Sequence, residues 1–304
     1  MEKTFADRIK LALREPKRVA VYMLCCIAPL LPDRLYLKWL FRLRMGYRLN
    51  LDIPQTFSEK LQWLKLYDRK PEYTQMVDKY EAKRYVADII GEEYIIPTLG
   101  VWDSVDDIDF EALPNQFVLK TTHGGGNMGV VICRDKSTFD IPKAKAKLRS
   151  SLNKCIYRQF REWPYKSVKR RIIAETLIGD GQIDDYKFFC FEGEVKLCQV
   201  ISGRESIMSI DFFDKEWRHQ PFHEPKEYPF SAHEITKPKL YDKMWDIADR
   251  LCKGHHFIRV DLYEISGRIY FGELTFFPTS GMGGFDPKEW DYRFGEWIKL
   301  PIRL

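Results

Sequence analysis

The chain has 304 residues, of which 45% are apolar and 31% are charged. A chain of this length can bury a sizeable core, and its composition is that of a soluble globular protein with two or three lobes. The seven cysteines are odd in number and show no C-x-x-C spacing, so they indicate neither a zinc ribbon nor a disulfide framework. We therefore expect reduced thiols and a cytoplasmic location.

The basic charge is concentrated at the start of the chain. The formal net charge is +5, but residues 1–50 hold eleven Lys or Arg residues against four Asp or Glu residues. That segment alone carries +7 (11 − 4), so the other 254 residues sum to −2. A nucleic-acid-binding fold needs a basic face on its body, so we expect no nucleic-acid partner.

Residues 1–53 are expected to form a basic helical N-terminal segment. Within it, Val19 to Pro32 is an uncharged run of 14 residues with basic residues on both sides. The run is shorter than the roughly 20 residues that a spanning helix needs, and Pro29 interrupts it. Two interpretations remain open. One is an ordinary buried helix, and the other is a basic amphipathic segment within residues 1–50 that contacts an anionic membrane surface.

The next helices are predicted from capping signals and periodicity. Thr56 and Glu59 have the spacing of a capping box, which predicts a helix start. A second helix is predicted from Tyr73 to Ile90, with Gly91 as its stop signal.

From residue 116 the chain changes to short β-type runs bounded by Gly or Asp. Two helices interrupt them: a basic surface helix over residues 141–160 and an amphipathic helix over residues 238–252. The pattern predicts an α+β fold built from hairpins. The strand candidates are residues 117–120, 130–133, 171–178, 186–191, 194–201, 257–265 and 268–276. Before them, residues 95–114 are expected to form a short strand, an acidic loop and a turn.

The first pair of strand candidates encloses a glycine-rich loop. Gly124, Gly126 and Gly129 have the G-x-G-x-x-G spacing, but a β-type run follows them instead of the helix that a dinucleotide site requires. What remains is strand, loop, strand, with Lys120 just before the loop. Such glycines let backbone N–H groups approach a phosphate closely. A phosphate cradle and a plain hairpin tip with a solvated lysine both remain open.

The last pair of strand candidates forms a hairpin with two acidic residues. A three-residue loop at 265–267 would pair residue 261 with 271 and residue 259 with 273. That register aligns four side chains on one face: Arg259, Asp261, Glu273 and Thr275. Carboxylate oxygens suit Mg²⁺, although an outer face with alternating charge would show the same pattern.

Four segments together resemble a known family. They are "DKYEAKRYV" (78–86), "FVLKTTHGGGNMGV" (117–130), "IIAETLIGDGQIDDYKF" (172–188) and "RVDLYEISGRIYFGELTFFPTSG" (259–281). Their order is similar to that of the ATP-grasp ligases, and more narrowly to the TupA-like branch of teichuronopeptide and surface-polysaccharide biosynthesis. The resemblance covers about residues 54–304. It implies an ATP-grasp fold with a reduced N-terminal subdomain (54–115), a lid with the glycine-rich hairpin (116–170) and a C-terminal subdomain with the acidic hairpin (171–304).

The resemblance also implies roles for individual residues. ATP phosphates would meet Lys79, Lys120 and the loop residues His123, Gly124, Gly125, Gly126 and Asn127. The adenine would lie at a hinge over residues 175–178, with Glu175, Leu177 and Ile178, and the ribose would meet Asp185. Mg²⁺ would be held by Asp261, Glu273 and Thr275, where Thr275 replaces the usual Asn. Catalytic roles are expected for Arg259 and Lys187, and Arg204 is a candidate for binding an anionic substrate.

The expected reaction is amide formation through an acyl phosphate. The carboxylate would be a uronic acid of a glycan, the amine an amino acid, and the place the cytoplasm at the inner face of the membrane. Two alternatives stay open. One is a metal-dependent glycosyltransferase that uses Asp107 and Asp109, and the other is a non-catalytic assembly protein apposed to the membrane.

Overall fold

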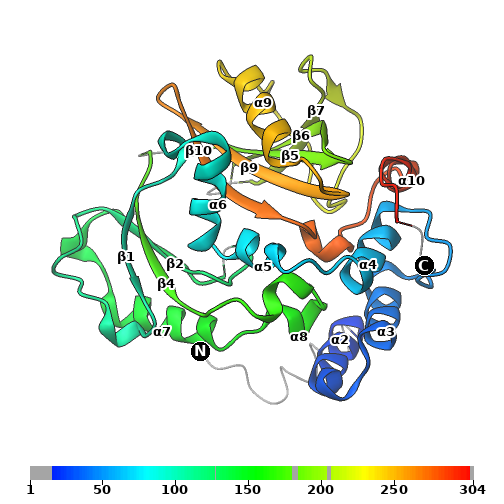
Figure 1. The fold of residues 1–304 in the computed structure, drawn as a ribbon, viewed down its shortest axis with the longest axis horizontal. Helices are drawn as coiled ribbons and strands as arrows, with labels where there is room; N and C mark the ends of the chain where they lie inside the picture. The colour runs from blue at the N-terminus through cyan, green and yellow to red at the C-terminus, as the bar shows by residue number, and fades with distance from the viewer. Residues whose placement is uncertain (1–15, 127, 180–183, 204–206, 302–304) are drawn as a thin grey trace.

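The protein is built around two antiparallel sheets, seen in a computed structural model that describes residues 16–126, 128–179, 184–203 and 207–301 (Figure 1). The small sheet has four strands in the order β1-β4-β2-β3, and the large sheet has six in the order β10-β9-β5-β6-β7-β8. Helices pack around both sheets, which confirms the predicted α+β class.

The strands of the small sheet are β1 (Thr98–Trp102), β2 (Phe117–Thr121), β3 (Val130–Cys133) and β4 (Ile172–Thr176). Those of the large sheet are β5 (Asp185–Phe191), β6 (Glu194–Ser202), β7 (Ser209–Phe213), β8 (His219–Gln220), β9 (Phe257–Ile265) and β10 (Arg268–Thr275). Every strand candidate of the sequence is present, and β7 and β8 were not predicted. Because β4 pairs with both β1 and β2, the three predicted subdomains share one sheet, and their boundaries stay a prediction.

The helices are α2 (Pro16–Ile27), α3 (Asp33–Met45), α4 (Phe57–Tyr67), α5 (Glu72–Val77), α6 (Glu81–Ile90), α7 (Ile141–Leu152), α8 (Ile156–Phe160), α9 (Tyr241–Leu251) and α10 (Glu289–Glu296). The capping box at the start of α4 is confirmed. The Thr56 hydroxyl accepts from the Glu59 amide, and the Glu59 carboxylate accepts from the Thr56 amide. The basic helix predicted over residues 141–160 is two helices, α7 and α8.

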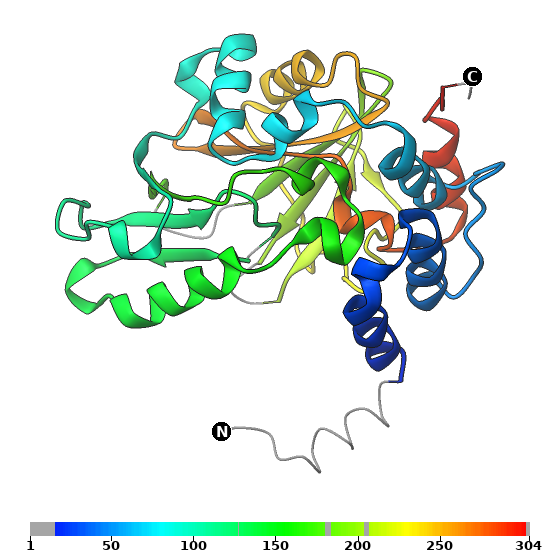
Figure 2. The same cartoon turned by 60° about the horizontal axis from the view of Figure 1, so that its bottom comes forward.

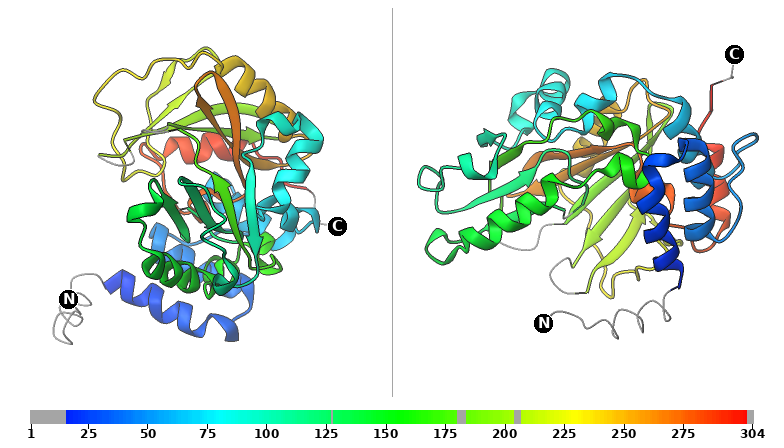
Figure 3. Two further views of the ribbon diagram at one scale, coloured as in Figure 1. Left: turned by 90° about the vertical axis from the view of Figure 1, so that its left-hand side faces the viewer. Right: turned by 90° about the horizontal axis from the view of Figure 1, so that it is seen from below.

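Strand β5 divides the main core between two layers of helices. Because successive side chains of a strand point to opposite faces, Phe188 packs against Trp245 of α9, while Phe189 packs against Phe294 of α10. A second core lies between the small sheet and α7, where Leu148 is fully buried. Figure 2 and the right-hand view of Figure 3 show α7 along the small sheet and the N-terminal helices at the other end of the molecule.

The N-terminal helices pack on the protein with one side only. Four residues of α3 are fully buried, but Leu24 is the only buried residue of α2. The interpretation of Val19–Pro32 as an ordinary buried helix is therefore wrong, because its apolar side chains have no facing layer to cover them. Within the described ranges, no helix combines the length and the apolar character that crossing a membrane requires.

Candidate active site

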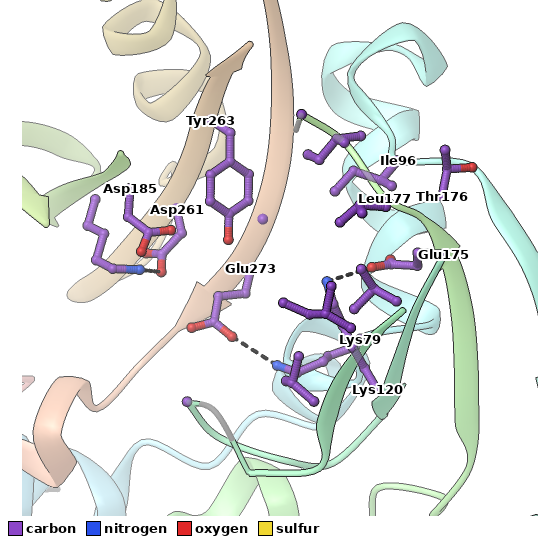
Figure 4. A pocket seen from close by; sticks show the side chains of 18 of the residues that line it. Lys79, Ile96, Lys120, Glu175, Thr176, Leu177, Asp185, Asp261, Tyr263 and Glu273 are labelled. Carbon is purple, nitrogen blue, oxygen red and sulfur yellow. Dashed lines mark hydrogen bonds and ion pairs between the residues drawn. The ribbon is translucent and has the colours of Figure 1, made fainter. Parts of the chain in front are cut away.

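The cleft between the two sheets collects most of the predicted site residues (Figure 4). Its volume is about 270 Å³, just below the range of ligand pockets, which typically measure about 300–1,000 Å³. Strands β2, β3 and β4 form one wall, and β5, β9 and β10 form the other. The predicted residues that line it are Lys79, Lys120, Gly126, Glu175, Leu177, Ile178, Asp185, Lys187, Asp261 and Glu273.

The turn of the β9–β10 hairpin differs from the predicted one. Ile265 pairs with Arg268, so the loop has two residues, not three. Both loop residues have positive φ, 51° at Ser266 and 72° at Gly267, as in the type I′ turn that matches the twist of a hairpin. The predicted three-residue loop and its register are wrong.

A bulge at Gly272 restores the alignment that the predicted loop would have given. The register shifts between Phe271 and Glu273, so Glu273 lies opposite Asp261 and Thr275 lies opposite Arg259. Directly opposed residues project from the same face of a sheet. The prediction that these four side chains share one face is therefore confirmed, but the bulge accounts for it. A two-residue turn without a bulge would have put Glu273 on the other face.

Asp261 is the centre of a buried charge network. The residue is 1% exposed, and its carboxylate accepts two hydrogen bonds from the Arg259 guanidinium, each 2.7 Å long. The ammonium of Lys187 also binds Asp261, because Lys187 lies opposite it on the neighbouring strand β5. Two buried cations thus share one carboxylate.

Glu273 is held by cations from both walls of the cleft. Lys79 binds its Oε2 at 2.9 Å, and Arg259 binds its Oε1 at 3.2 Å. Arg259 also donates to the Thr275 hydroxyl at 3.2 Å. Burial opposes the charge of Glu273, but the positive charges of Lys79, Lys187 and Arg259 outweigh it and hold its pKa well below the ordinary value. Glu273 is therefore ionised at any physiological pH.

Lys79 reaches the cleft because the predicted helix Tyr73–Ile90 is broken. Helix α5 ends at Val77, and Asp78 then accepts hydrogen bonds from the amides of Tyr80 and Glu81 at the start of α6. The Lys79 amide binds the Thr122 carbonyl at 3.0 Å. The prediction of one helix was wrong because these contacts, and the ion pair of Asp78 with the distant Arg171, favour the break.

The opposite end of the cleft is mostly apolar around one buried carboxylate. Glu175 is 4% exposed and pairs with Lys120 and Lys83, each at 2.5 Å. Burial disfavours its charge, but the two lysines hold its pKa below the ordinary value. The apolar surface is supplied by Ile96, Val118, Val130, Ile132, Leu177 and Ile178. This end can accept a flat, largely apolar ring with polar edges.

The glycine-rich loop uses its glycines for two purposes. A Cβ at Gly129 would lie 2.3 Å from the Ser151 hydroxyl of α7, so this position needs close packing. Gly126 has φ +54°, has open space around it and lines the cleft. Gly126 of the loop and Lys120 before it therefore both line the cleft, as the interpretation of the loop as a phosphate cradle requires.

Several predicted residues lie outside the cleft lining. His123 is 3% exposed, and burial lowers the pKa of its imidazole. It faces the interior, and the structure does not bring it or its neighbours Gly124 and Gly125 to the cleft wall. Arg259 and Thr275 join the site through their contacts with Asp261 and Glu273. Asn127 and Arg204 fall outside the described residues.

Several residues of the site were missed at the level of sequence, among them Lys83 and Tyr263. Lys83 lies four residues after Lys79 and binds Glu175 from the first turn of α6. Tyr263 lines the cleft two residues after Asp261 on β9. The period of two along a strand would have found Tyr263, whereas no local pattern separates Lys83 from a surface lysine.

The family model of the TupA-like ATP-grasp proteins matches residues 59–299. The chain belongs to this TupA-like ATP-grasp family. The resemblance stated from the four sequence segments is thereby confirmed, and the family belongs to the ATP-grasp ligases. No curated protein matches the chain.

Solved structures similar to this TupA-like protein are other ATP-grasp enzymes. D-alanine–D-alanine ligase from Bacillus anthracis, complexed with ATP, shares 16% identity over 66% of this chain and 53% of that chain, with a TM-score of 0.38. N5-carboxyaminoimidazole synthetase from Staphylococcus aureus, complexed with ADP, shares 13% identity over 73% and 52%, with a TM-score of 0.43. The ligase PsnB with Mg and ADP shares 13% over 72% and 57%, with a TM-score of 0.37. The chain thus spans just over half the length of each.

Proposed function

We propose that the protein joins a carboxylate to an amine at the expense of ATP, through an acyl phosphate. The observation that supports this best is the cleft itself, where Lys79 reaches Glu273 of the carboxylate hairpin and Lys120 lines the same cleft, paired with Glu175. ATP would lie with its adenine against the apolar end near Glu175 and its phosphates toward Gly126 and the hairpin.

The lysines of the cleft are placed to exchange partners when a nucleotide enters. Lys79 and Lys120 are paired with Glu273 and Glu175 in the structure. A triphosphate carries more negative charge than either carboxylate, and charge-assisted hydrogen bonds to phosphate are among the strongest in proteins. Both ammonium groups would therefore turn to the phosphates, which also frees a Glu273 oxygen.

The donor set fits Mg²⁺ that arrives with a nucleotide. Among the described residues, no group of three or more His, Cys, Asp or Glu side chains could hold a metal alone. Mg²⁺ however is commonly held by one or two carboxylates together with phosphates and waters, and Asp261 and Glu273 are the two carboxylates. Thr275 would add a hydroxyl. When bound, Mg²⁺ would neutralise the charge on the transferring phosphate.

Arg259 and Lys187 supply fixed positive charge beside the transferring phosphate. The Coulombic effect of Asp261 and Glu273 outweighs burial and raises the pKa of Arg259 above its ordinary value, so the guanidinium stays charged. Preorganised cations stabilise charge that develops in a transition state without reorganisation. In phosphoryl transfer such positioning and electrostatics provide most of the catalysis.

The proposed reaction has two steps. A carboxylate oxygen of the acceptor attacks the γ-phosphorus of ATP, the bond to the bridging oxygen breaks and ADP leaves. The neutral amine then attacks the acyl carbon, phosphate leaves and the amine loses a proton, which gives an amide. No side-chain nucleophile is required.

The substrate class follows from the family and stays a proposal. We infer a uronic acid of a bacterial surface polysaccharide or its precursor as the carboxylate and an amino acid as the amine, joined in the cytoplasm near the inner face of the membrane. The TupA-like family assignment supports this choice.

The glycosyltransferase alternative receives no support from the structure. Asp107 and Asp109 are exposed, and neither lines the cleft. The Asp109 carboxylate accepts from the amides of Glu111 and Ala112, so its role is to form a turn.

The test is ADP release from MgATP with a panel of uronic acids and amino acids. We expect release that requires both members of one pair. A matched pair of variants locates the nucleotide: Lys120→Met should weaken ATP binding, whereas Lys143→Met, an exposed residue on α7, should not. If no pair stimulates release and Lys120→Met binds ATP like the wild type, the ligase proposal fails. A Glu273→Gln variant that keeps full biological function would favour the non-catalytic alternative.

A further inference from the structure

The N-terminal helices carry an unusual concentration of exposed apolar side chains. Among the residues that the structure describes, eight of the fifteen exposed large apolar ones lie between residues 16 and 47. We call the outer side of these helices the α2–α3 face. Its most exposed members are Leu30 at 83%, Tyr22 at 69%, Met23 at 62% and Trp39 at 46%. Scattered apolar residues are normal on a surface, but a cluster of this kind marks an interaction site.

The α2–α3 face is fixed to the body of the protein. On the inner side of α3, Tyr36 and Phe41 are fully buried. Asp33, at the start of α3, pairs with Arg69 at 2.7 Å and with Arg161 at 2.9 Å, and it accepts from the Tyr157 hydroxyl. Because the inner side is held in this way, the outer apolar side chains cannot turn inward to form a core.

The same face is strongly basic. Residues 16–48 contain seven Lys or Arg residues and one acidic residue, Asp33, whose charge is taken up on the inner side. The cations and the apolar side chains are adjacent to one another. A groove of about 660 Å³ is lined by Met23, Leu24, Ile27, Trp39, Arg42 and Arg48, among others. A second groove, of about 780 Å³, lies along the other side of α2 and is lined by Lys17, Arg18, Arg44 and Arg158, among others.

We propose that the α2–α3 face docks on the surface of an anionic phospholipid bilayer. Tyr22, Met23, Leu30 and Trp39 would insert at the level of the acyl boundary, and the basic side chains of the two grooves would bind headgroup phosphates. This pairing of an apolar stripe with a Lys- and Arg-rich surround is what interfacial helices use. Figures 2 and 3 show α2 at the edge of the molecule, where a flat surface can reach it.

The positive charge and the apolar side chains of the α2–α3 face together favour an anionic bilayer over a second copy of the chain or a nucleic acid. In a symmetric dimer the same face meets itself, so the cations of the two grooves would face the same cations of the second copy across an apolar contact. A nucleic acid would satisfy the charges but would leave the apolar side chains against phosphate. An anionic bilayer matches both features at once.

Docking is independent of the proposed reaction, since the α2–α3 face and the cleft share no lining residue. The experiment is co-sedimentation of the full chain with vesicles of phosphatidylcholine alone and with phosphatidylglycerol added. We expect binding only to the anionic vesicles, weakened by salt. Asp261→Asn should bind vesicles like the wild type, which separates a failure of docking from a failure of the ligase proposal.

Two triple variants, each with a matched control, test the contact residues. Tyr22→Ser, Met23→Ser and Leu30→Ser together should weaken binding at least about 10-fold, whereas Ile53→Ser, Ile207→Ser and Tyr292→Ser, which are also exposed, should change it less than about 2-fold. Lys17→Gln, Arg42→Gln and Arg48→Gln together should weaken it about 100-fold, since each cation near the surface contributes about 5-fold. The control is Lys143→Gln, Lys147→Gln and Lys215→Gln, all exposed.

Five results would overturn the proposal. Four of them are absence of binding to the anionic vesicles, equal binding to neutral vesicles, equal losses in test and control variants, and a soluble dimer that the apolar triple variant dissociates. The fifth is saturable binding of inorganic diphosphate that abolishes vesicle binding. That result would indicate a site for a single soluble phosphate group and not a surface that docks on a bilayer. Unchanged thermal unfolding of the triple variants shows that folding is not the cause of a loss.

Discussion

The β9–β10 and β2–β3 hairpins face each other across the cleft, but they reach their geometry in different ways. In β9–β10, a bulge at Gly272 sets which face Glu273 occupies, and ion pairs with Arg259, Lys187 and Lys79 fix its carboxylates. In β2–β3, small residues let the loop approach α7 and the cleft. The geometry of β9–β10 thus depends on strand register and charge, whereas that of β2–β3 depends on glycines that leave room for close packing.

This difference predicts different sensitivities to mutation. The carboxylate hairpin should fail when a charge or its position changes, because its groups are buried and paired before any ligand binds. Mutations in the glycine hairpin should instead weaken nucleotide binding. Gly126 lies in open space, and Lys120 has one carboxylate partner, which it would exchange for a phosphate.

The largest effect is expected for Asp261→Asn. This change removes a predicted metal ligand and leaves the buried cations Arg259 and Lys187 without their shared carboxylate. We expect kcat for ADP release to fall about 100- to 1,000-fold and thermal stability to fall as well, because unpaired buried charges are costly.

Thr275→Val is the matched comparison on the same face. It removes a hydroxyl that interacts with Arg259 and Glu273 and leaves all formal charges in place. Its loss in kcat should be at least 10-fold smaller than that of Asp261→Asn. Equal losses in the two variants would show that charge does not set the sensitivity of this hairpin.

The second effect tests the bulge. A Cβ at Gly272 would lie 2.9 Å from the Tyr263 ring and 3.1 Å from the Asp261 carbonyl oxygen. Gly272→Val should therefore displace Glu273 and lower kcat about 10- to 100-fold. Deletion of Gly272 should cost less, because a regular two-residue hairpin without that residue still pairs Glu273 with Asp261. A deletion that is more harmful than the valine would contradict the register argument.

The third effect concerns the glycine hairpin. Lys120→Met should raise KM for ATP about 10- to 100-fold, the value of a charge-assisted contact, with a smaller change in kcat. Gly126→Ala should raise the KM for ATP at most about 5-fold, since only the backbone strain at φ +54° opposes the added Cβ. A loss confined to kcat in Lys120→Met would place Lys120 in the chemistry and remove the contrast between the hairpins.

The last expected effect concerns stability and not the cleft, because Glu224 is buried and does not line the cleft. Burial raises the pKa of Glu224 to about 8, against the opposing charge of Arg259. Between the unfolded and folded pKa values the unfolded chain binds fewer protons, so stability should fall as pH rises from about 5 to 8. The slope approaches about 1.4 kcal/mol per pH unit, and Glu224→Gln should remove it. Chemical unfolding at several pH values measures the stability of the wild type and of Glu224→Gln. The same dependence on pH in the two proteins would contradict the expectation.

The sequence was informative wherever local pattern determines structure. Every strand candidate and the Thr56 capping box are present, and alternation put Arg259 and Asp261 on one face. Prediction from the sequence failed where contacts with residues distant in the chain determine the local structure. The break at Asp78 depends on Arg171, and the bulge at Gly272 depends on the pairing of β9 and β10. The run at Val19–Pro32 looked like a core helix because sequence does not show whether a facing layer exists.

The most direct test of the central claim follows an oxygen atom. With an oxygen-18-labelled carboxylate substrate, an amine and MgATP, the carboxylate oxygen that attacks the γ-phosphorus must leave with phosphate when the amide forms. The account predicts one oxygen-18 atom in the released inorganic phosphate for each amide made. Amide formation with unlabelled phosphate, or label retained entirely in the amide and its precursor, would contradict the acyl-phosphate mechanism.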